Sequence, residues 1–170
     1  MTGPPRDTQR ALFYEAESAV HNLFAAPTPT VEIAGAQLTL PPEARFGSVE
    51  SARRYVTQVL SRESVRRLFP RATIDVEVRS RRGHRSAHYE SPADPTVAPT
   101  IALPEMADGR WALRELVVLH ELAHHLIEPG QPAHGARFAS TLIELVSDVL
   151  GPEAGFVYRV ILTDSGIAVR

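Results

Sequence analysis

Apolar residues recur with helical spacing from Asp7 to about Ala25, where the segment APTP interrupts the pattern. The stripe consists of Ala11, Leu12, Ala16, Ala19, Val20, Leu23 and Phe24. Because residues three and four positions apart share one face of a helix, this spacing predicts an amphipathic N-terminal helix. The two prolines that follow it predict its end.

Two further helices are predicted before Pro70. Ser48 is a suitable N-cap, and a helical apolar stripe follows it through VESARRYVTQVL. The short segment SRESVRRLF predicts a second helix that stops before the proline. Upstream of both, VEIAGAQLTLPP (31–42) predicts one or two short strands around Gly35.

The middle of the chain has the pattern of strands. ATIDVEVRS (72–80) alternates apolar and polar residues, which indicates a half-buried strand. RRGH (81–84) predicts a turn, and SAHYE (86–90) predicts a strand that returns antiparallel. PTIALP (99–104), which is bounded by prolines, predicts a third strand.

Helices are predicted again in the C-terminal part. One runs from about Gly109 to Ile127, where EPGQP interrupts it, and the next, in AHGARFASTLIELVSDVLG, ends at Gly151. Pro152 can open a last helix, because proline is favoured at the first helical position. The predicted apolar face of that helix carries Phe156, Val157, Val160 and Ile161. Since helices flank a small strand cluster without βαβ alternation, the predicted class is α+β.

The 170 residues are long enough for one domain that buries about 70% of its unfolded surface. We expect residues 1–6 to be disordered and residues 7–70 to form an N-terminal helical part. Residues 72–150 form the expected core with the candidate site, and residues 151–170 form a C-terminal helix and tail.

Composition narrows the classes of function. The 18 basic residues, all of them Arg, and 20 acidic residues give a net charge of −2, which argues against a protein that mainly coats nucleic acid. The absence of Cys excludes disulfides, a thiol nucleophile and a Cys-ligated zinc ribbon. The N-terminal residues lack the apolar core of a signal peptide, and the most apolar segment (111–127) carries charges. We therefore expect a cytoplasmic protein without a membrane span.

Four of the seven histidines lie in HELAHHLIEPGQPAHGARF (120–138). His120 and His124 are four residues apart on a predicted helix, so both can reach one Zn²⁺ at about 2.0–2.1 Å. Glu121 lies beside them, where a carboxylate can take a proton from the attacking water. Burying such groups among Leu, Val and Ala costs free energy unless a partner compensates, and a metal ion is such a partner. The alternative is a chance match on a buried helix whose histidines are only hydrogen-bonded.

A catalytic zinc takes three protein ligands and keeps one position open. His134 is the favoured third ligand, because EPGQP ends the helix and permits a reversal of the chain. Gly135 would let the backbone pass close to the site, and Phe138 could anchor the next helix beneath it. Glu144 on that helix is the competing third ligand.

The remaining histidines have other interpretations. His125 lies about 100° around the helix from His124, so we expect it to be structural or at the surface. His84 and His88 lie in the basic segment RSRRGHRSAHYE, where His88 or Tyr89 could stabilise an oxyanion. A solvated hairpin is the favoured interpretation of this segment.

The same segment raises the possibility of nucleic-acid binding. It contains Arg79, Arg81, Arg82 and Arg85, with Tyr89 as a stacking ring. Because Arg is the only cation of an acidic chain, we favour a charged edge that blocks aggregation.

The stretch from His120 to Phe138 resembles the SprT-like zinc metallopeptidases, in which an HExxH helix and a short insert precede a third His in an HGxxF or HGxxW sequence. The resemblance implies His120, His124 and His134 as ligands of one zinc ion and Glu121 as the general base. It also implies that PTIALP is an edge strand along which an extended peptide lies.

More specifically, RDTQRALFYEAE (6–17) together with the metal motif resembles a family of small metallohydrolases from high-GC bacteria without an assigned substrate. Because Cys and a separate DNA-binding region are lacking, the DNA–protein crosslink repair of some SprT-like peptidases is not carried over. The third His also follows closer than in those repair peptidases.

The sequence therefore predicts an α+β, minimal zincin-like metallopeptidase domain with a small antiparallel or mixed sheet beside the HExxH helix. Its predicted function is zinc-dependent hydrolysis of peptide bonds in a peptide or protein substrate. Two alternatives stay open: a zinc-stabilised binding module without catalysis, and a nucleic-acid-binding protein that uses the Arg-rich segment 79–85.

Overall fold

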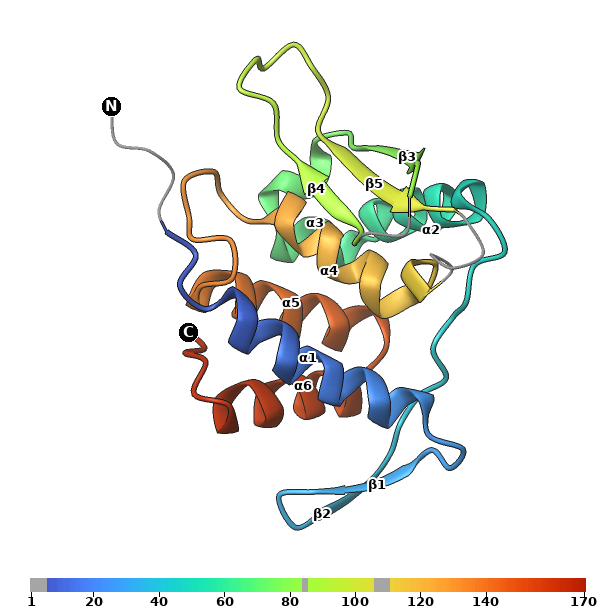
Figure 1. The fold of residues 1–170 in the computed structure, drawn as a ribbon, viewed down its shortest axis with the longest axis vertical. Coiled ribbons are helices and arrows are strands. Elements are labelled where there is room, and N and C mark those ends of the chain that lie inside the picture. Colours follow the sequence, from blue (N-terminus) through green and yellow to red (C-terminus); the bar gives the residue numbers. More distant parts are fainter. Residues whose placement is uncertain (1–5, 84–85, 106–110) are drawn as a thin grey trace. The chain divides into compact units, whose positions relative to one another are not determined.

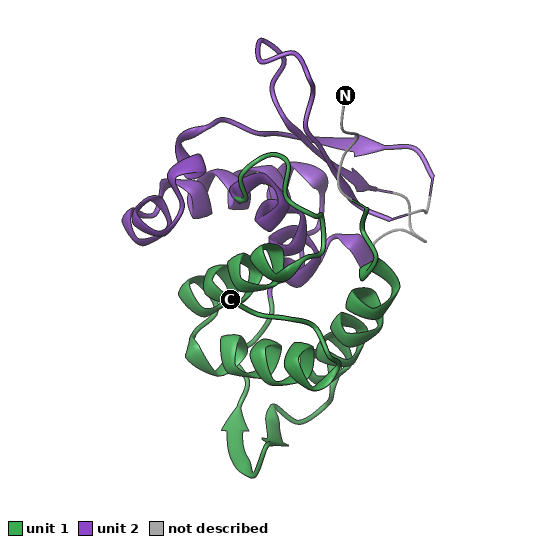
Figure 2. Ribbon diagram, turned by 90° about the vertical axis from the view of Figure 1, so that its left-hand side faces the viewer, with its two compact units in different colours: residues 1–43, 127–170 green, residues 44–126 purple. Residues whose placement is uncertain are grey.

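The computed structural model describes residues 6–83, 86–105 and 111–170, and its helices and small sheets confirm the α+β class (Figure 1). Contacts between Cα atoms divide the chain into two compact units (Figure 2). One unit comprises residues 1–43 and 127–170, and the other comprises residues 44–126. The single domain over 1–170 stays a prediction, and the expected disorder of residues 1–6 falls, apart from Arg6, outside the described residues.

In the unit of residues 1–43 and 127–170, the described residues (6–43 and 127–170) form three helices and a hairpin. Their bounds are α1 (Arg10–Ala25), β1 (Thr30–Ile33), β2 (Ala36–Thr39), α5 (Ala136–Val149) and α6 (Pro152–Asp164). Helix α6 packs against both α5 and α1, and the three helices lie together in Figure 1. The antiparallel hairpin turns through Ala34 (φ 50°) and Gly35 (φ 77°), the left-handed pair that suits a two-residue connection. The predicted N-terminal helix and the strands around Gly35 are confirmed.

The final helix begins at Pro152 as predicted, but its buried face differs from the predicted one. Phe156 is 37% exposed. The buried residues of α6 are Ala154, Gly155, Val157, Tyr158 and Leu162. Its apolar face is therefore rotated away from Phe156, because the close packing of α5 at Gly155 fixes which side of α6 is covered.

The unit of residues 44–126 consists of helices on one face of a three-stranded sheet (Figure 1). Its elements are α2 (Val49–Ser61), α3 (Glu63–Leu68), a 3₁₀-helix η1 (Pro70–Thr73), β3 (Glu77–Arg81), β4 (His88–Glu90), β5 (Thr100–Pro104) and α4 (Glu115–Leu126). The Ser48 hydroxyl accepts a hydrogen bond from the Ser51 amide at 3.2 Å, which confirms the predicted N-cap. Helix α2 packs against β3, and α4 packs against β4 and η1.

The sheet corrects three expectations. The strand predicted over 72–80 begins only at Glu77, because Pro70 opens a 3₁₀-helix instead. The strand order is β3-β5-β4, with β3 parallel and β4 antiparallel to β5, so β5 separates the two strands expected to pair directly. PTIALP is thus the central strand and not an edge strand. All five residues of β5 are buried, as expected of the central strand of the sheet.

Helix α4 begins at Glu115, later than the predicted start at Gly109, which lies outside the described residues. Arg114 forms a β-bridge with Arg45, so the chain is still extended there. The Glu115 carboxylate then accepts hydrogen bonds from the Ala44 amide at 2.7 Å and the Tyr55 hydroxyl at 2.5 Å. Within the described parts of the chain, no helix combines the length and apolar character needed to cross a membrane.

Candidate metal centre

Helix α4 brings His120 and His124 to the same face. Their Nε2 atoms lie 3.2 Å apart, and the helix buries His120 to 3% exposure. Two ligands of a tetrahedral zinc, each at about 2.0–2.1 Å, are separated by about 3.3–3.4 Å. The observed separation of the two nitrogens therefore fits a shared metal ion. The i and i+4 spacing was the signal in the sequence that predicted this pair.

His134 lies in the connection between α4 and α5. Helix α4 ends at Leu126, Gly130 adopts a positive φ of 85°, and the Gly135 amide bonds to the Pro132 carbonyl at 3.2 Å. A Cβ at Gly135 would lie 3.1 Å from the Pro132 side chain, so glycine lets this turn close before α5 begins. The close backbone approach expected at Gly135 is thus made to Pro132.

His134 is only 4% exposed, and its ring has close neighbours from its own unit. Its Nδ1 lies 2.5 Å from Asp7 Oδ2. Three aromatic rings have centroids 5.1–5.3 Å from its own, those of Phe13, Tyr14 and Phe138. Phe138 is fully buried, in agreement with its predicted role as an anchor. Asp7 was not a predicted site residue, because its 127-residue separation from His134 leaves no local pattern.

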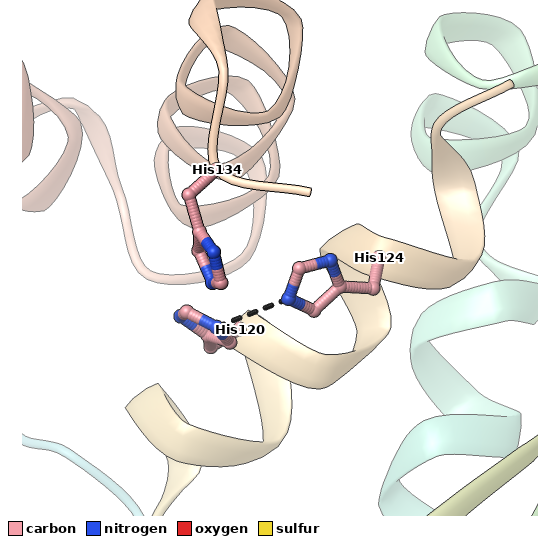
Figure 3. A group of neighbouring side chains, drawn as sticks. All are labelled: His120, His124 and His134. Atoms are coloured by element: carbon pink, nitrogen blue, oxygen red, sulfur yellow. Dashed lines mark hydrogen bonds between the residues drawn. The ribbon is translucent and has the colours of Figure 1, made fainter. Parts of the chain in front are cut away.

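The predicted ligand atoms of His120, His124 and His134 all lie within 4.8 Å of one another, and Figure 3 shows the three rings turned toward one another. Three imidazoles form a donor set that zinc uses in catalytic sites, with a fourth position left for water or substrate. The competing ligand Glu144 is exposed on α5 and does not belong to this group. The residues that the structure gathers thus fit one zinc ion, although occupancy by zinc remains a prediction.

Glu121 is buried on α4, with 4% of its surface exposed, directly after the first proposed ligand. A carboxylate in such surroundings needs compensating interactions, because burial of a charge is costly. Its role as the general base stays a prediction.

His125 is a structural residue, as its position around the helix predicted. The ring is fully buried, and its Nε2 lies 2.8 Å from the Ile74 carbonyl oxygen. A carbonyl only accepts, so Nε2 carries the proton and Nδ1 accepts from the Tyr89 hydroxyl at 3.3 Å. Burial lowers the pKa of His125, which favours this neutral ring.

Tyr89 and His88 point to opposite faces of β4, as consecutive strand residues do. The Tyr89 ring is nearly parallel to that of His124, at 11°, with 6.4 Å between centroids. His88 Nδ1 instead lies 2.6 Å from an Arg81 nitrogen, and its Nε2 lies 2.5 Å from Glu90. The two are therefore placed differently, and only Tyr89 is directed at α4.

Arginines of the segment 79–85, which was considered for nucleic-acid binding, lie on the polar face of the sheet. Arg79 donates to Glu90 at 3.1 Å, and Arg81 donates to the Ser86 carbonyl oxygen at 2.8 Å. Arg79 and Arg81 thus bond within this part of the chain, which favours the interpretation as a charged, solvated face. His84 and Arg85 lie outside the described residues.

Comparison of the chain with protein-family models, with curated proteins and with solved structures gives no match.

Proposed function

We propose that this chain is a zinc-dependent hydrolase and, more specifically, a cytoplasmic metallopeptidase. The observation that carries the proposal is the grouping of three imidazoles, two of them with Nε2 atoms 3.2 Å apart, on and after a helix that also buries Glu121. The resemblance of the motif to SprT-like metallopeptidases supports the same conclusion. A zincin-like core over residues 72–150 forms part of this proposal.

His120, His124 and His134 would hold the metal ion. A zinc bound there supplies a Lewis acid that polarises a scissile carbonyl and lowers the pKa of bound water toward about 7. Glu121 accepts a proton from the attacking water and delivers it to the leaving amine. The same set of groups would serve another amide or ester bond, so the peptide bond is proposed on the basis of the resemblance.

The sheet offers a different place for an extended substrate than the sequence predicted. Strand β4 pairs with β5 alone within the described part of residues 44–126, and it packs against α4. A peptide backbone can add to such an edge through main-chain hydrogen bonds. We therefore place the substrate along β4, where Tyr89 lies against His124.

Metal analysis tests the ligand set. We expect about one zinc per chain in protein purified without added metal, and its loss from His120→Ala and His134→Ala. Glu144→Ala is the matched control, since this residue is exposed on α5, and it should keep the zinc. Far-UV circular dichroism of each variant separates the loss of a ligand from the loss of the fold. Loss of zinc only from Glu144→Ala would overturn the ligand assignment.

A peptide-library assay with Glu121→Gln tests the reaction. The amide is nearly isosteric but cannot accept the proton, so zinc content should be unchanged while turnover falls by about 10²–10⁴-fold. Equal turnover by wild type and variant would contradict the role of Glu121. No zinc-dependent cleavage of any peptide or ester by the zinc-loaded wild type would contradict the hydrolase proposal.

The low exposure of His120 and His134 favours a second candidate, a zinc-stabilised binding module. A structural zinc contributes directly to folding, so the metal-free protein would unfold. A catalytic site on a pre-formed core predicts a metal-free protein that keeps its helical circular dichroism. The two candidates are therefore distinguished by one spectrum recorded after chelation.

A further inference from the structure

The segment before α1 reaches a proposed metal ligand. Asp7 lies three residues before the first residue of α1, and its Oδ2 lies 2.5 Å from Nδ1 of His134. Both residues belong to the unit of residues 1–43 and 127–170. The Asp7 side chain is 21% exposed and the imidazole only 5%, so the contact is largely shielded from water.

Helix capping does not explain the position of Asp7. An acidic residue near a helix start usually accepts a hydrogen bond from the first-turn amides. The N-cap of α1 is Gln9, and α1 has no side-chain cap hydrogen bond. The carboxylate of Asp7 is directed at His134 instead.

This contact determines which nitrogen of His134 can bind a metal. An ionised carboxylate only accepts hydrogen bonds, so Nδ1 of His134 carries the proton and the lone pair is on Nε2. The aromatic rings of Phe13, Tyr14 and Phe138 surround the imidazole and restrict its rotation. Asp7 therefore fixes the tautomer, and the three aromatic residues, two of them from the segment 7–14, fix the direction of this side chain.

We propose that Asp7 is the positioning residue for His134 as a metal ligand, so that the N-terminal segment forms part of the metal centre. The inference rests on the proposed function insofar as His134 binds zinc. A carboxylate on the second nitrogen of a ligating histidine orients the ring and makes it a stronger donor, and its loss typically costs 10–100-fold in metal affinity.

The test is the zinc dissociation constant of the full chain, measured by competition with a chromophoric chelator. Asp7→Ala should weaken zinc binding by about 10–100-fold, and Asp7→Glu should recover part of the loss. Glu15→Ala is the matched control, because it removes one exposed carboxylate of α1 and should bind zinc like the wild type. The visible absorption of cobalt-loaded protein gives a second readout, which should change in Asp7→Ala and not in Glu15→Ala.

The outcomes separate this inference from the proposed function. If the wild type binds zinc and His134→Ala loses it, while Asp7→Ala binds as tightly as the wild type, the positioning role is wrong and the hydrolase proposal stands. If the wild type binds no zinc even when zinc is offered, both are wrong. Unfolding of the metal-free variants in urea shows whether a weaker affinity reflects only a less stable fold, which would also contradict the positioning role.

Discussion

At the scale of single residues, His124 and His125 are neighbours with opposite environments. His124 is half-buried beside His120, whereas His125 is fully buried and bonded to the Ile74 carbonyl oxygen. The 100° rotation between consecutive helix residues produces this division of roles. The ring that lies closer to the core keeps a lowered pKa and stays neutral.

His125→Leu should destabilise the protein without removing zinc. The leucine leaves the Ile74 carbonyl and the Tyr89 hydroxyl without the bonds they make to the ring, which costs about 1–3 kcal/mol. Urea unfolding measures the loss, and metal analysis of the folded variant shows whether zinc is retained. His88→Leu is the control, since its exposed contacts should contribute less than about 1 kcal/mol. Loss of zinc from a folded His125→Leu variant would instead identify His125 as a ligand.

At the scale of elements, the chain shows which features a sequence pattern can predict. Helices α1, α2 and α6 begin within three residues of their predicted starts, because periodicity and caps such as Ser48 and Pro152 are local signals. Strand order depends on partners far apart in sequence, so the place of β5 between β3 and β4 was missed. The apolar run 101–104 was the available signal that this strand is buried.

In the candidate site, too, the local features could be predicted from the sequence and the non-local ones could not. The pairing of His120 with His124 could be predicted from their spacing on one helix. The position of His134 near them could be predicted from the turn that follows this helix. The contact of His134 with Asp7 is non-local and no spacing rule contains it. Sequence patterns thus predicted the proposed ligand set, while the contact of His134 with Asp7 could be found only from the fold.

The packing of α5 on α6 depends on one glycine. A Cβ at Gly155 would lie 1.7 Å from Ser147 Oγ and 2.9 Å from Ser147 Cβ. Although alanine is the better helix former by about 1 kcal/mol, we expect Gly155→Ala to lower the free energy of unfolding by about 1–3 kcal/mol. Thermal unfolding should show the loss, and Ser147→Ala in the same chain should restore part of it by removing the nearer atom.

The matched control for this glycine is Gly47→Ala, because an added Cβ there has no neighbour within 4 Å. We expect its stability to be close to that of the wild type. A Gly155→Ala variant as stable as the wild type would show that the two helices separate at little cost.

The polar face of the sheet should respond to acid. Hydrogen bonding from His88, followed by the contacts with Arg79, lowers the pKa of Glu90 below its ordinary 4.5. Since the folded-state pKa is depressed, the stabilisation is present above the unfolded value and is lost as the pH falls through the folded value. Glu90→Gln should therefore be less stable than the wild type by under about 1 kcal/mol at pH 6, with the difference vanishing at lower pH. Urea unfolding across this range measures it, and a constant difference would contradict the assignment.

At the scale of the whole molecule, the proposed ligands are distributed over both compact units. His120 and His124 belong to residues 44–126, and His134 belongs to the unit of residues 1–43 and 127–170. A metal ion that binds only the folded protein stabilises every part whose folding is needed for the ligand set. The response of each unit to zinc therefore reports which residues bind it.

Zinc should raise the stability of both units together. The only tryptophan, Trp111, lies in residues 44–126, so its fluorescence follows that unit, while far-UV circular dichroism follows the helices of both. At a free zinc concentration about 100 times the dissociation constant, the free energy of unfolding should rise by about 2.7 kcal/mol by either probe. In His134→Ala, both shifts should disappear. If zinc instead shifts the Trp111 transition alone and still does so in His134→Ala, the ligands lie within residues 44–126 and His134 is not among them.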